Sequence, residues 1–373
     1  MRQALVDVRR STLQLAEAYE SALAPAGMQV AYATGVNPPL WEWGHTAWFQ
    51  EFWIGRNLQR SLGVQCDPLH ARASSLLQHS DEWFDSSRVE HSSRWRLSLP
   101  GAGATREYLA ATLQQTLALL DALPAGAGAA DLYFFRLVAL HEAMHAEAAT
   151  YMAKALGIAI PAASGAGGAQ AQTPAVCRIP AQAAFQLGAS GDGFAFDNEL
   201  GPHPVRLGAF EIDAQPVRWD RFLAFAEAGG YRQKRWWTDA GWSWLQRQHQ
   251  REEKLPVPGD TGLSAMHLTA HEAQAWCRWA GRRLPTEAEW ECAAISDADF
   301  EWGSVWEWTA SAFQPYPGFT PHPYRDYSQP WFGTRRVLRG ACQATSPWLA
   351  HPRYRNFFEP HRDDVFAGFR SCA

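Results

Sequence analysis

The stretch LHEAMHAEA, residues 140–148, places His141 and His145 four residues apart in a segment with helical periodicity. On an α-helix, side chains at this spacing project from one face, so both imidazoles can bind the same metal ion. A second such segment, NPPLWEWGHTAWFQEFW at residues 37–53, carries His45. Three imidazoles from two helices cover one face of a metal and leave the other face open, as catalysis requires.

Working outward from these stretches, residues 1–160 have the pattern of a helical bundle. Apolar residues recur at three- and four-residue spacing in four segments. The connection between the second and third segments, residues 61–102, is long, but its aromatic and arginine residues indicate an ordered loop. We therefore expect a four-helix bundle, with helices at about 5–24, 40–60, 103–123 and 131–156.

The composition changes after the bundle. Residues 161–176 are rich in Pro, Gly, Ala and Ser, which is typical of a linker. Residues 177–373 have short segments and many turns, and they predict an α+β domain with much irregular structure. The chain holds 19 tryptophans, which suit either a densely packed core or an aromatic box for a quaternary ammonium group.

Bulk composition limits the class of protein. The 373 residues are 47% hydrophobic and 19% charged, with a net charge of −5 and no basic run, which argues against nucleic acid or a membrane surface as partner. No apolar stretch is long enough to span a bilayer, and the charged N-terminal segment is not a signal peptide. The six cysteines form no CxxC pair and are expected to be free thiols. We predict a cytoplasmic protein that acts on small molecules; composition leaves its oligomeric state open.

The metal site has a plainer alternative, since histidine pairs at helical spacing also arise by chance. Glu142 and Glu147 either orient an imidazole or, more commonly for such residues, lie in solvent. His267 and His271 share the spacing but open a helix, and we interpret them as structural. A three-histidine set admits zinc with one open position or Fe(II) with three, and ligand type does not separate the two metals.

Five strings in the C-terminal half, taken together and in order, resemble the formylglycine-generating-enzyme-like domain, a fold related to C-type lectins. The resemblance covers most of residues 180–373, and the N-terminal helices resemble the DinB-like four-helix bundle. A DinB-like bundle followed by this domain is the arrangement of the ergothioneine sulfoxide synthase family. The strings are FDNELGPHPVRLGAFEID (196–213), AGRRLPTEAEWECAA (280–294), GSVWEWTASAFQPYPGF (303–319), RVLRGA (336–341) and FAGFR (366–370).

The resemblance implies a non-heme iron enzyme that uses dioxygen to attach sulfur to carbon 2 of the imidazole of hercynine (Nα-trimethylhistidine). It assigns Fe(II) to His45, His141 and His145, with O2 as co-substrate. It also implies a tyrosine that donates a proton during the reaction with dioxygen. Tyr324 and Tyr316, which lie in one loop, are the candidates, and we favour Tyr324.

The string RYRNFFEP, residues 353–360, is the expected substrate-binding stretch. The resemblance assigns hercynine to Asn356 and Phe357, with Arg355 and Phe358 beside them. Ring faces attract a trimethylammonium group, which has no N–H donor, and an amide can bond to the imidazole or the carboxylate. From the residues alone, the favoured interpretation is that the two phenylalanines belong to the core.

Two departures from the family pattern concern the second substrate. Phe358 stands where synthases that use γ-glutamylcysteine have an acid, and Glu142, Ala143 and Met144 replace the glutamine-rich residues found between the histidines in many members. The whole pattern looks most like the selenoneine synthase branch, which forms a carbon–selenium bond between a selenosugar and hercynine. The alternative is a carbon–sulfur bond with cysteine or γ-glutamylcysteine, as in ergothioneine biosynthesis.

Three other kinds of protein share parts of this pattern. Formylglycine generators use a cysteine pair that would fall at Ser346 and His351, so the chain lacks those thiols. A DinB-type zinc thiol transferase would use the bundle histidines but has no need of the RYRNFF stretch. A lectin-like binding module would need no histidine triad.

Overall fold

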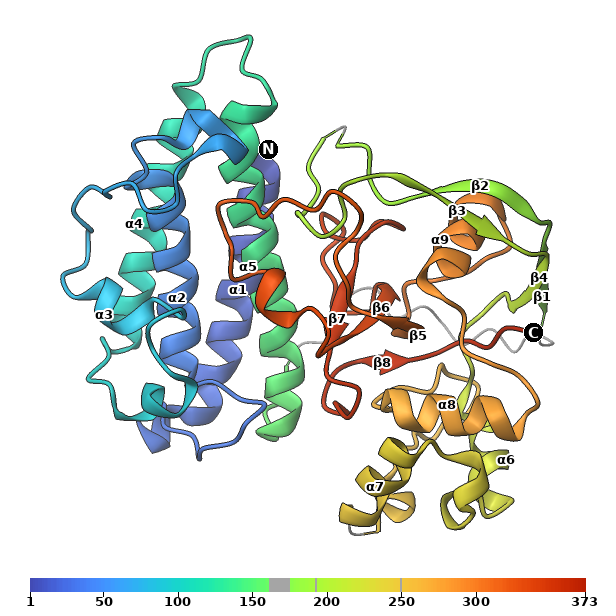
Figure 1. Cartoon of the computed structure of the whole chain (residues 1–373). Coiled ribbons are helices and arrows are strands. Elements are labelled where there is room, and N and C mark those ends of the chain that lie inside the picture. The colour runs from blue at the N-terminus through green and yellow to red at the C-terminus, as the bar shows by residue number, and fades with distance from the viewer. Residues whose placement is uncertain (161–174, 192, 249) are drawn as a thin grey trace. The chain divides into compact units, whose positions relative to one another are not determined.

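The computed structural model describes residues 1–160, 175–191, 193–248 and 250–373 (Figure 1). The chain forms two compact units. The helical unit comprises Met1–Ala162, His322–Asp326 and Ala344–Leu349, and the mixed unit comprises Ala163–Pro321, Tyr327–Gln343 and Ala350–Ala373. The predicted linker lies outside the described residues except for its last two residues, the second of which begins the first strand.

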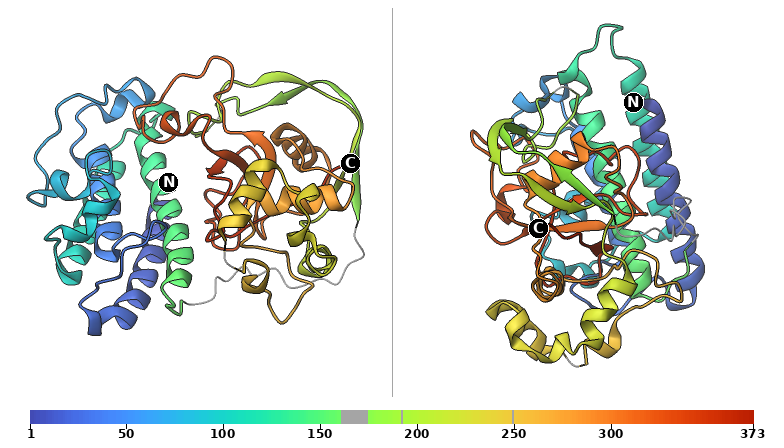
Figure 2. Two further views of the ribbon diagram at one scale, coloured as in Figure 1. Left: turned by 60° about the horizontal axis from the view of Figure 1, so that its bottom comes forward. Right: turned by 90° about the vertical axis from the view of Figure 1, so that its right-hand side faces the viewer.

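The described part of the helical unit contains four long helices that lie side by side in both Figure 1 and Figure 2. The first and last of them pack along one another. A short helix, α3, lies in the long connection between the second and third, together with several single turns. The bounds are Arg2–Leu23 (α1), Pro39–Gln50 (α2), Ser80–Phe84 (α3), Ala102–Asp121 (α4) and Ala129–Ala155 (α5).

Helix α2 is buried along almost its whole length, as its aromatic sequence requires. It starts with Pro39 in the first turn, where a missing N–H costs no hydrogen bond. The α-helix is shorter than the segment that the sequence predicts, because it passes after Gln50 into a wider turn, Glu51–Gly55, closed by a bond from the Arg56 N–H to the Glu51 carbonyl. Turns of this π type often occur near functional sites.

Helix α5 carries the histidine pair and is fixed firmly at its N-terminal end. The carboxylate of Asp131 accepts a hydrogen bond from the Gly128 N–H, 2.9 Å away. Along the helix, Phe134, Val138 and His141 are buried on one face, which follows from their three- and four-residue spacing. His141 is therefore buried within the bundle, and His145, one turn further along the helix, is partly buried.

The mixed unit is built on small sheets. A four-stranded sheet has the order β7-β6-β5-β8, with β8 parallel to β5 and the other pairs antiparallel, and two further hairpin-like pairs join β1 to β4 and β2 to β3. The strands are Val176–Ile179 (β1), Gln182–Leu187 (β2), His203–Leu207 (β3), Phe210–Asp213 (β4), Trp306–Ala312 (β5), Arg336–Gly340 (β6), Asn356–Phe358 (β7) and Ala367–Gly368 (β8).

Short helices cover these strands, and tryptophans fill the core as expected from the composition. Trp290, Trp306 and Trp308 are fully buried. Two of the helices begin with reciprocal caps in which a threonine hydroxyl and a glutamate carboxylate bond each other's backbone N–H. The helices are Trp219–Glu227 (α6), Asp239–Arg247 (α7), Ala270–Trp279 (α8) and Glu287–Ser296 (α9).

None of the helices in the described residues combines the length and apolar character needed to cross a membrane.

Candidate metal centre in the helical unit

Three imidazoles meet inside the helical unit. His45 comes from α2, and His141 and His145 come from α5. One nitrogen of each ring lies within 4.8 Å of the others, and the Nε2 atoms of His141 and His145 are 3.2 Å apart. Within the described parts of the chain, no other group of three or more His, Cys, Asp or Glu side chains is close enough to share an ion.

The geometry and protonation of the three rings fit a metal ion. Two nitrogens that each bind one ion at about 2.1 Å lie roughly 3.0–3.4 Å from one another, which matches the 3.2 Å between the Nε2 atoms of His141 and His145. Burial, with the charge of His145, lowers the pKa of His45 to about 3, and burial likewise lowers the pKa of His141 well below its usual value. Both rings are therefore neutral, which is the form that binds metals.

His45 is oriented from behind by the backbone. Its Nδ1–H donates to the carbonyl of Phe84, 2.8 Å away, which leaves Nε2 with a free lone pair. The Phe84 ring lies so close to α2 that a Cβ on Gly44 would come within 2.2 Å of it. A larger residue at position 44 would therefore force the Phe84 ring to shift.

His145 is oriented by a carboxylate that the sequence reasoning missed. Glu42, one turn before His45 on α2, lies with Oε1 2.5 Å from Nδ1 of His145. Burial raises the pKa of Glu42, but the charge and hydrogen bond of His145 outweigh this effect and lower the pKa to about 2. A carboxylate behind a metal-binding imidazole is a common arrangement in proteins. The signal in the sequence was a glutamate between two tryptophans, WEW, in a helical segment rich in aromatic residues.

Two acids on α5 differ from what the sequence predicts for them. Glu142 is buried and bonds the guanidinium of Arg9 at 2.7 and 3.0 Å, and Glu147 is buried and accepts a 2.5 Å hydrogen bond from the hydroxyl of Thr345. The interpretation of these acids as solvated is wrong, because each has a partner that compensates for its burial. Glu142 joins α5 to α1 and is directed at an arginine.

Tyr324 belongs to the helical unit and lies beside the histidines. Its ring centroid is 5.8 Å from that of His141 and 4.8 Å from that of Phe49, which itself stacks on His141 at 3.5 Å. Tyr324 belongs to the segment His322–Asp326, which contacts α5 through Tyr133: the Tyr133 hydroxyl is 3.0 Å from Nδ1 of His322. Burial raises the pKa of Tyr324, with a smaller contribution from nearby Asp residues. Its phenol is therefore protonated.

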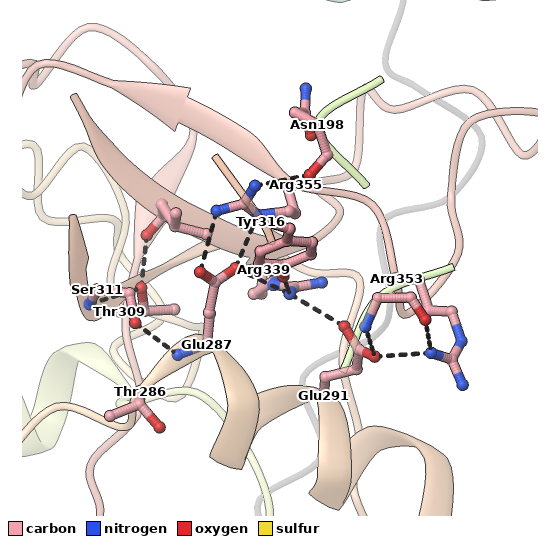
Figure 3. A network of polar contacts seen from close by, with 12 residues as sticks. Asn198, Thr286, Glu287, Glu291, Thr309, Ser311, Tyr316, Arg339, Arg353 and Arg355 are labelled. Carbon is pink, nitrogen blue, oxygen red and sulfur yellow. Dashed lines mark hydrogen bonds and ion pairs between the residues drawn. The ribbon is translucent and has the colours of Figure 1, made fainter. Parts of the chain in front are cut away.

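Tyr316 and Arg355 lie in a buried polar network of the mixed unit (Figure 3). The Tyr316 hydroxyl donates to Glu287 at 2.9 Å and accepts from Arg339 at 3.0 Å. Arg355 is fully buried and bonds both carboxylate oxygens of Glu287, at 2.8 and 3.0 Å, and two backbone carbonyls, one of them that of Asn198. The polar groups of both residues are thus engaged in holding the unit together.

Asn356, Phe357 and Phe358 form β7, the edge strand of the four-stranded sheet. All three are partly exposed, unlike Arg355 before them. Phe357 stacks on Phe313 with 4.1 Å between centroids, and Phe358 lies under the guanidinium of Arg362 at 5.1 Å. An edge strand with half-exposed aromatic rings is a surface that a ligand can reach.

The class of protein follows from both halves of the chain. Residues 4–149 match the DinB superfamily, and residues 164–303 and 298–373 match the sulfatase-modifying factor enzyme 1-like domain. The predicted fold, a DinB-like bundle followed by a formylglycine-generating-enzyme-like domain, is confirmed. The C-terminal part is also similar to the formylglycine-generating enzyme of Streptomyces coelicolor, with 26% identity over 46% of this chain and 78% of that protein.

Similarity over the whole chain narrows this class. The hercynine oxygenase of Mycolicibacterium thermoresistibile is 30% identical over 98% of this chain and 93% of its own length. The hercynine oxygenase of Mycolicibacterium smegmatis is 30% identical over 97% and 96%, respectively. The chain belongs to the hercynine oxygenase family, and it is an oxygen-dependent oxidoreductase.

Proposed function

We propose that this protein is a non-heme iron enzyme that uses dioxygen to join selenium of a selenosugar to carbon 2 of the hercynine imidazole. The observation that carries the proposal is the convergence of three imidazoles, two of them buried and held neutral, beside a protonated phenol, in a chain of the hercynine oxygenase family. We expect the reaction to take place in the cytoplasm.

The proposed roles of the residues follow from their chemistry. His45, His141 and His145 hold Fe(II), which, when bound, supplies open positions for substrates and the electrons that activate dioxygen. Tyr324 holds a proton at its phenol oxygen, beside His141, ready for transfer during the reaction. Asn356 bonds the polar end of hercynine, and the phenylalanine that follows it attracts the trimethylammonium group.

The proposed reaction balances. The C2–H bond of the imidazole and the Se–H bond of the selenosugar break, and C–Se and Se=O bonds form. Dioxygen accepts four electrons, one of its atoms becoming the selenoxide oxygen and the other leaving as water with the two hydrogens.

Two features support an uncharged donor, such as a selenosugar, over an amino-acid or dipeptide thiol. Phe358 stands on β7 where an acid would suit a dipeptide thiol, and the carboxylate of Glu142, between the two histidines of α5, is neutralised by Arg9. A phenyl ring suits the apolar face of a sugar and gives no charge to a zwitterion. The second candidate is sulfoxide formation with cysteine or γ-glutamylcysteine, which is favoured by the name hercynine oxygenase that the relatives carry.

Product analysis tests the proposal. Metal-free protein is loaded with Fe(II) or, in parallel, with zinc, and each sample receives hercynine, air and one donor: a selenosugar, a thiosugar, cysteine or γ-glutamylcysteine. We expect oxygen uptake only with iron, and a product whose mass contains selenium. Product from thiol donors alone would overturn the selenium assignment and leave the family assignment intact. A zinc-dependent transfer without oxygen uptake would point instead to a DinB-type thiol transferase.

A further inference from the structure

One arginine outside the ligand helices reaches toward two of the three histidines. Arg94 lies in the turn His91–Arg96, within the long connection between α2 and α4. Its guanidinium takes part in two separate chains of contacts, both inside the helical unit. One chain runs through hydrogen bonds and the other through stacked rings.

The first chain ends at His145. Nη1 of Arg94 donates to the side-chain oxygen of Asn37 at 2.8 Å, and the amide nitrogen of Asn37 donates to Oε2 of Glu42 at 2.8 Å. The other oxygen of Glu42 is the one that bonds Nδ1 of His145. The Asn37 amide has an oxygen and a nitrogen, and the Glu42 carboxylate has two oxygens, so each group bonds one neighbour with each of its two atoms. The position of the guanidinium therefore fixes the plane of the Glu42 carboxylate, and this plane sets the tilt of the His145 imidazole.

The second chain ends at His45. The guanidinium carbon of Arg94 lies 3.6 Å from the centre of the Trp41 ring, and Trp41 stacks on His45 at 4.9 Å with an angle of 7° between the planes. The Trp41 ring cannot slide freely, since its Nε1–H donates to the carbonyl of Trp83 at 2.7 Å. The imidazole of His45 therefore lies between the Trp41 indole, which this hydrogen bond fixes, and helix α5.

We propose that Arg94 is a positioning residue for the metal centre, acting on His145 through Asn37 and Glu42 and on His45 through Trp41. Arginine suits both tasks, because its planar group donates along its edge and stacks with its face, whereas lysine offers a single point charge. Burial of Arg94 lowers its pKa, and Glu42 is the charge that opposes this effect. The inference rests on the proposed metal site and is independent of the identity of either substrate.

The test measures metal binding in the full-length, metal-free protein, with Co(II) as a spectroscopic probe and Fe(II) in parallel. Removal of a group behind a metal-binding imidazole weakens metal affinity about 10- to 100-fold. Arg94 acts on His145 through Asn37 and Glu42, so for R94M we expect a smaller loss that still exceeds about twofold, together with altered visible absorption bands of bound Co(II). N37A and W41L each cut one chain, and we expect each to give part of the change in the bands. R94K keeps the charge and should give an intermediate loss.

The matched control is R106M. Arg106 also joins two elements of the bundle, through bonds to Glu20 at 2.7 and 3.0 Å, and belongs to neither chain of contacts. We expect it to alter thermal stability and to leave both the Co(II) bands and the affinity unchanged. A further test of the first chain is Glu42→Gln, which removes the charge behind His145. Its control is Glu51→Gln, because Glu51 is a buried carboxylate bonded to Tyr108, Ser75 and a backbone N–H and belongs to neither chain of contacts.

Four results would overturn the proposal. The first is an R94M protein that keeps its affinity within twofold and its Co(II) bands unchanged. The second is an equal loss of affinity in R94M and R106M that follows their loss of thermal stability, since this would indicate a role in folding alone. If R94M does not fold, the proposal is overturned by an R94K protein whose Co(II) bands and metal affinity equal those of the wild type. A wild-type protein that binds neither Co(II) nor Fe(II) removes the metal site itself, and the inference with it.

Discussion

The helical unit and the mixed unit each bury a polar cluster, and the two clusters use their bonding groups in opposite ways. In the mixed unit, the carboxylate of Glu287 accepts hydrogen bonds from Tyr316, Arg339 and Arg355 (Figure 3). In the helical unit, the outer nitrogens of His45 and His145 are bonded to a carbonyl and a carboxylate, while their inner nitrogens converge on a third imidazole.

This difference separates a structural cluster from a candidate site. Opposite charges in the mixed unit compensate one another, which lowers the cost of burying them. The Nε2 atoms of His141 and His145, which face each other at 3.2 Å, gain much more from a shared cation than from one weak hydrogen bond. The convergence of imidazole nitrogens on one point, rather than the number of polar groups, therefore indicates where a metal ion binds.

The largest effect is expected from removing an imidazole of the triad. H141A leaves two ligands from different helices, so we expect Fe(II) affinity to fall by more than the roughly 100-fold seen when only an outer group is lost. Oxygen uptake should be abolished. The matched control is H271A, whose imidazole lies near Trp244 in the mixed unit and outside the triad. Metal analysis after dialysis gives the measurement, and equal iron contents in the two variants would contradict the assignment.

The next largest effect is on stability and concerns the other cluster. E287Q removes the charge that compensates Arg339 and Arg355, and loss of one partner from a buried ion pair costs about 3–5 kcal/mol. E211Q, at an exposed pair with Arg178, should change the free energy of unfolding by less than about 1 kcal/mol. Chemical denaturation measures both, while the iron content per folded molecule should stay unchanged.

Acid should act on the same cluster in a defined direction. Burial raises the pKa of Glu287, but Arg355 and Arg339 outweigh burial and the pKa is lowered. A carboxyl whose pKa is lower in the folded state stabilises the protein above its unfolded pKa and loses that contribution as the pH falls. The wild type should therefore lose more stability than E287Q on acidification. A parallel loss in both proteins would show that Glu287 is not the responsible group.

The sequence predicted the parts that follow from local periodicity. The His141–His145 spacing requires a common helix face, and the apolar pattern around His45 requires burial. The triad could therefore be predicted from the sequence. The four bundle helices and the change to short elements after the linker follow for the same reason. The exact end of α2 did not, because the wider turn after Gln50 depends on tertiary contacts.

The groups behind the histidines could not be predicted in this way. Glu42 points at His145, 103 residues away, and Arg94 reaches Asn37 across 57 residues. Such pairs depend on how helices and loops pack, and a single sequence holds no record of which side chains meet. Glu142 shows the opposite error. Its position between the histidines suggested that it orients an imidazole, but its carboxylate bonds Arg9 instead.

The two candidate tyrosines allow a smaller and sharper comparison. Y324F removes a phenol beside His141, and loss of a positioned proton donor lowers rates about 100-fold or more. Hercynine and Fe(II) affinities should be unchanged. Y316F removes the hydroxyl that bonds Glu287 and Arg339, so it should lower stability by about 1–3 kcal/mol and leave the rate per folded enzyme unchanged. Single-turnover oxygen consumption distinguishes them, and a normal rate in Y324F would remove its proposed role.

The smallest effect is expected at the edge strand of the mixed unit. F357L keeps an apolar side chain against Phe313 but loses the ring face that attracts a trimethylammonium group, which is worth about 0.5–2 kcal/mol or roughly 2- to 30-fold in hercynine affinity. Histidine, which lacks the methyl groups, should bind both proteins equally weakly. F358L changes the adjacent ring and should alter the preference among donors while leaving hercynine affinity unchanged. If calorimetry finds the two variants indistinguishable toward hercynine, the two rings act only in packing, as in the rest of the aromatic-rich mixed unit.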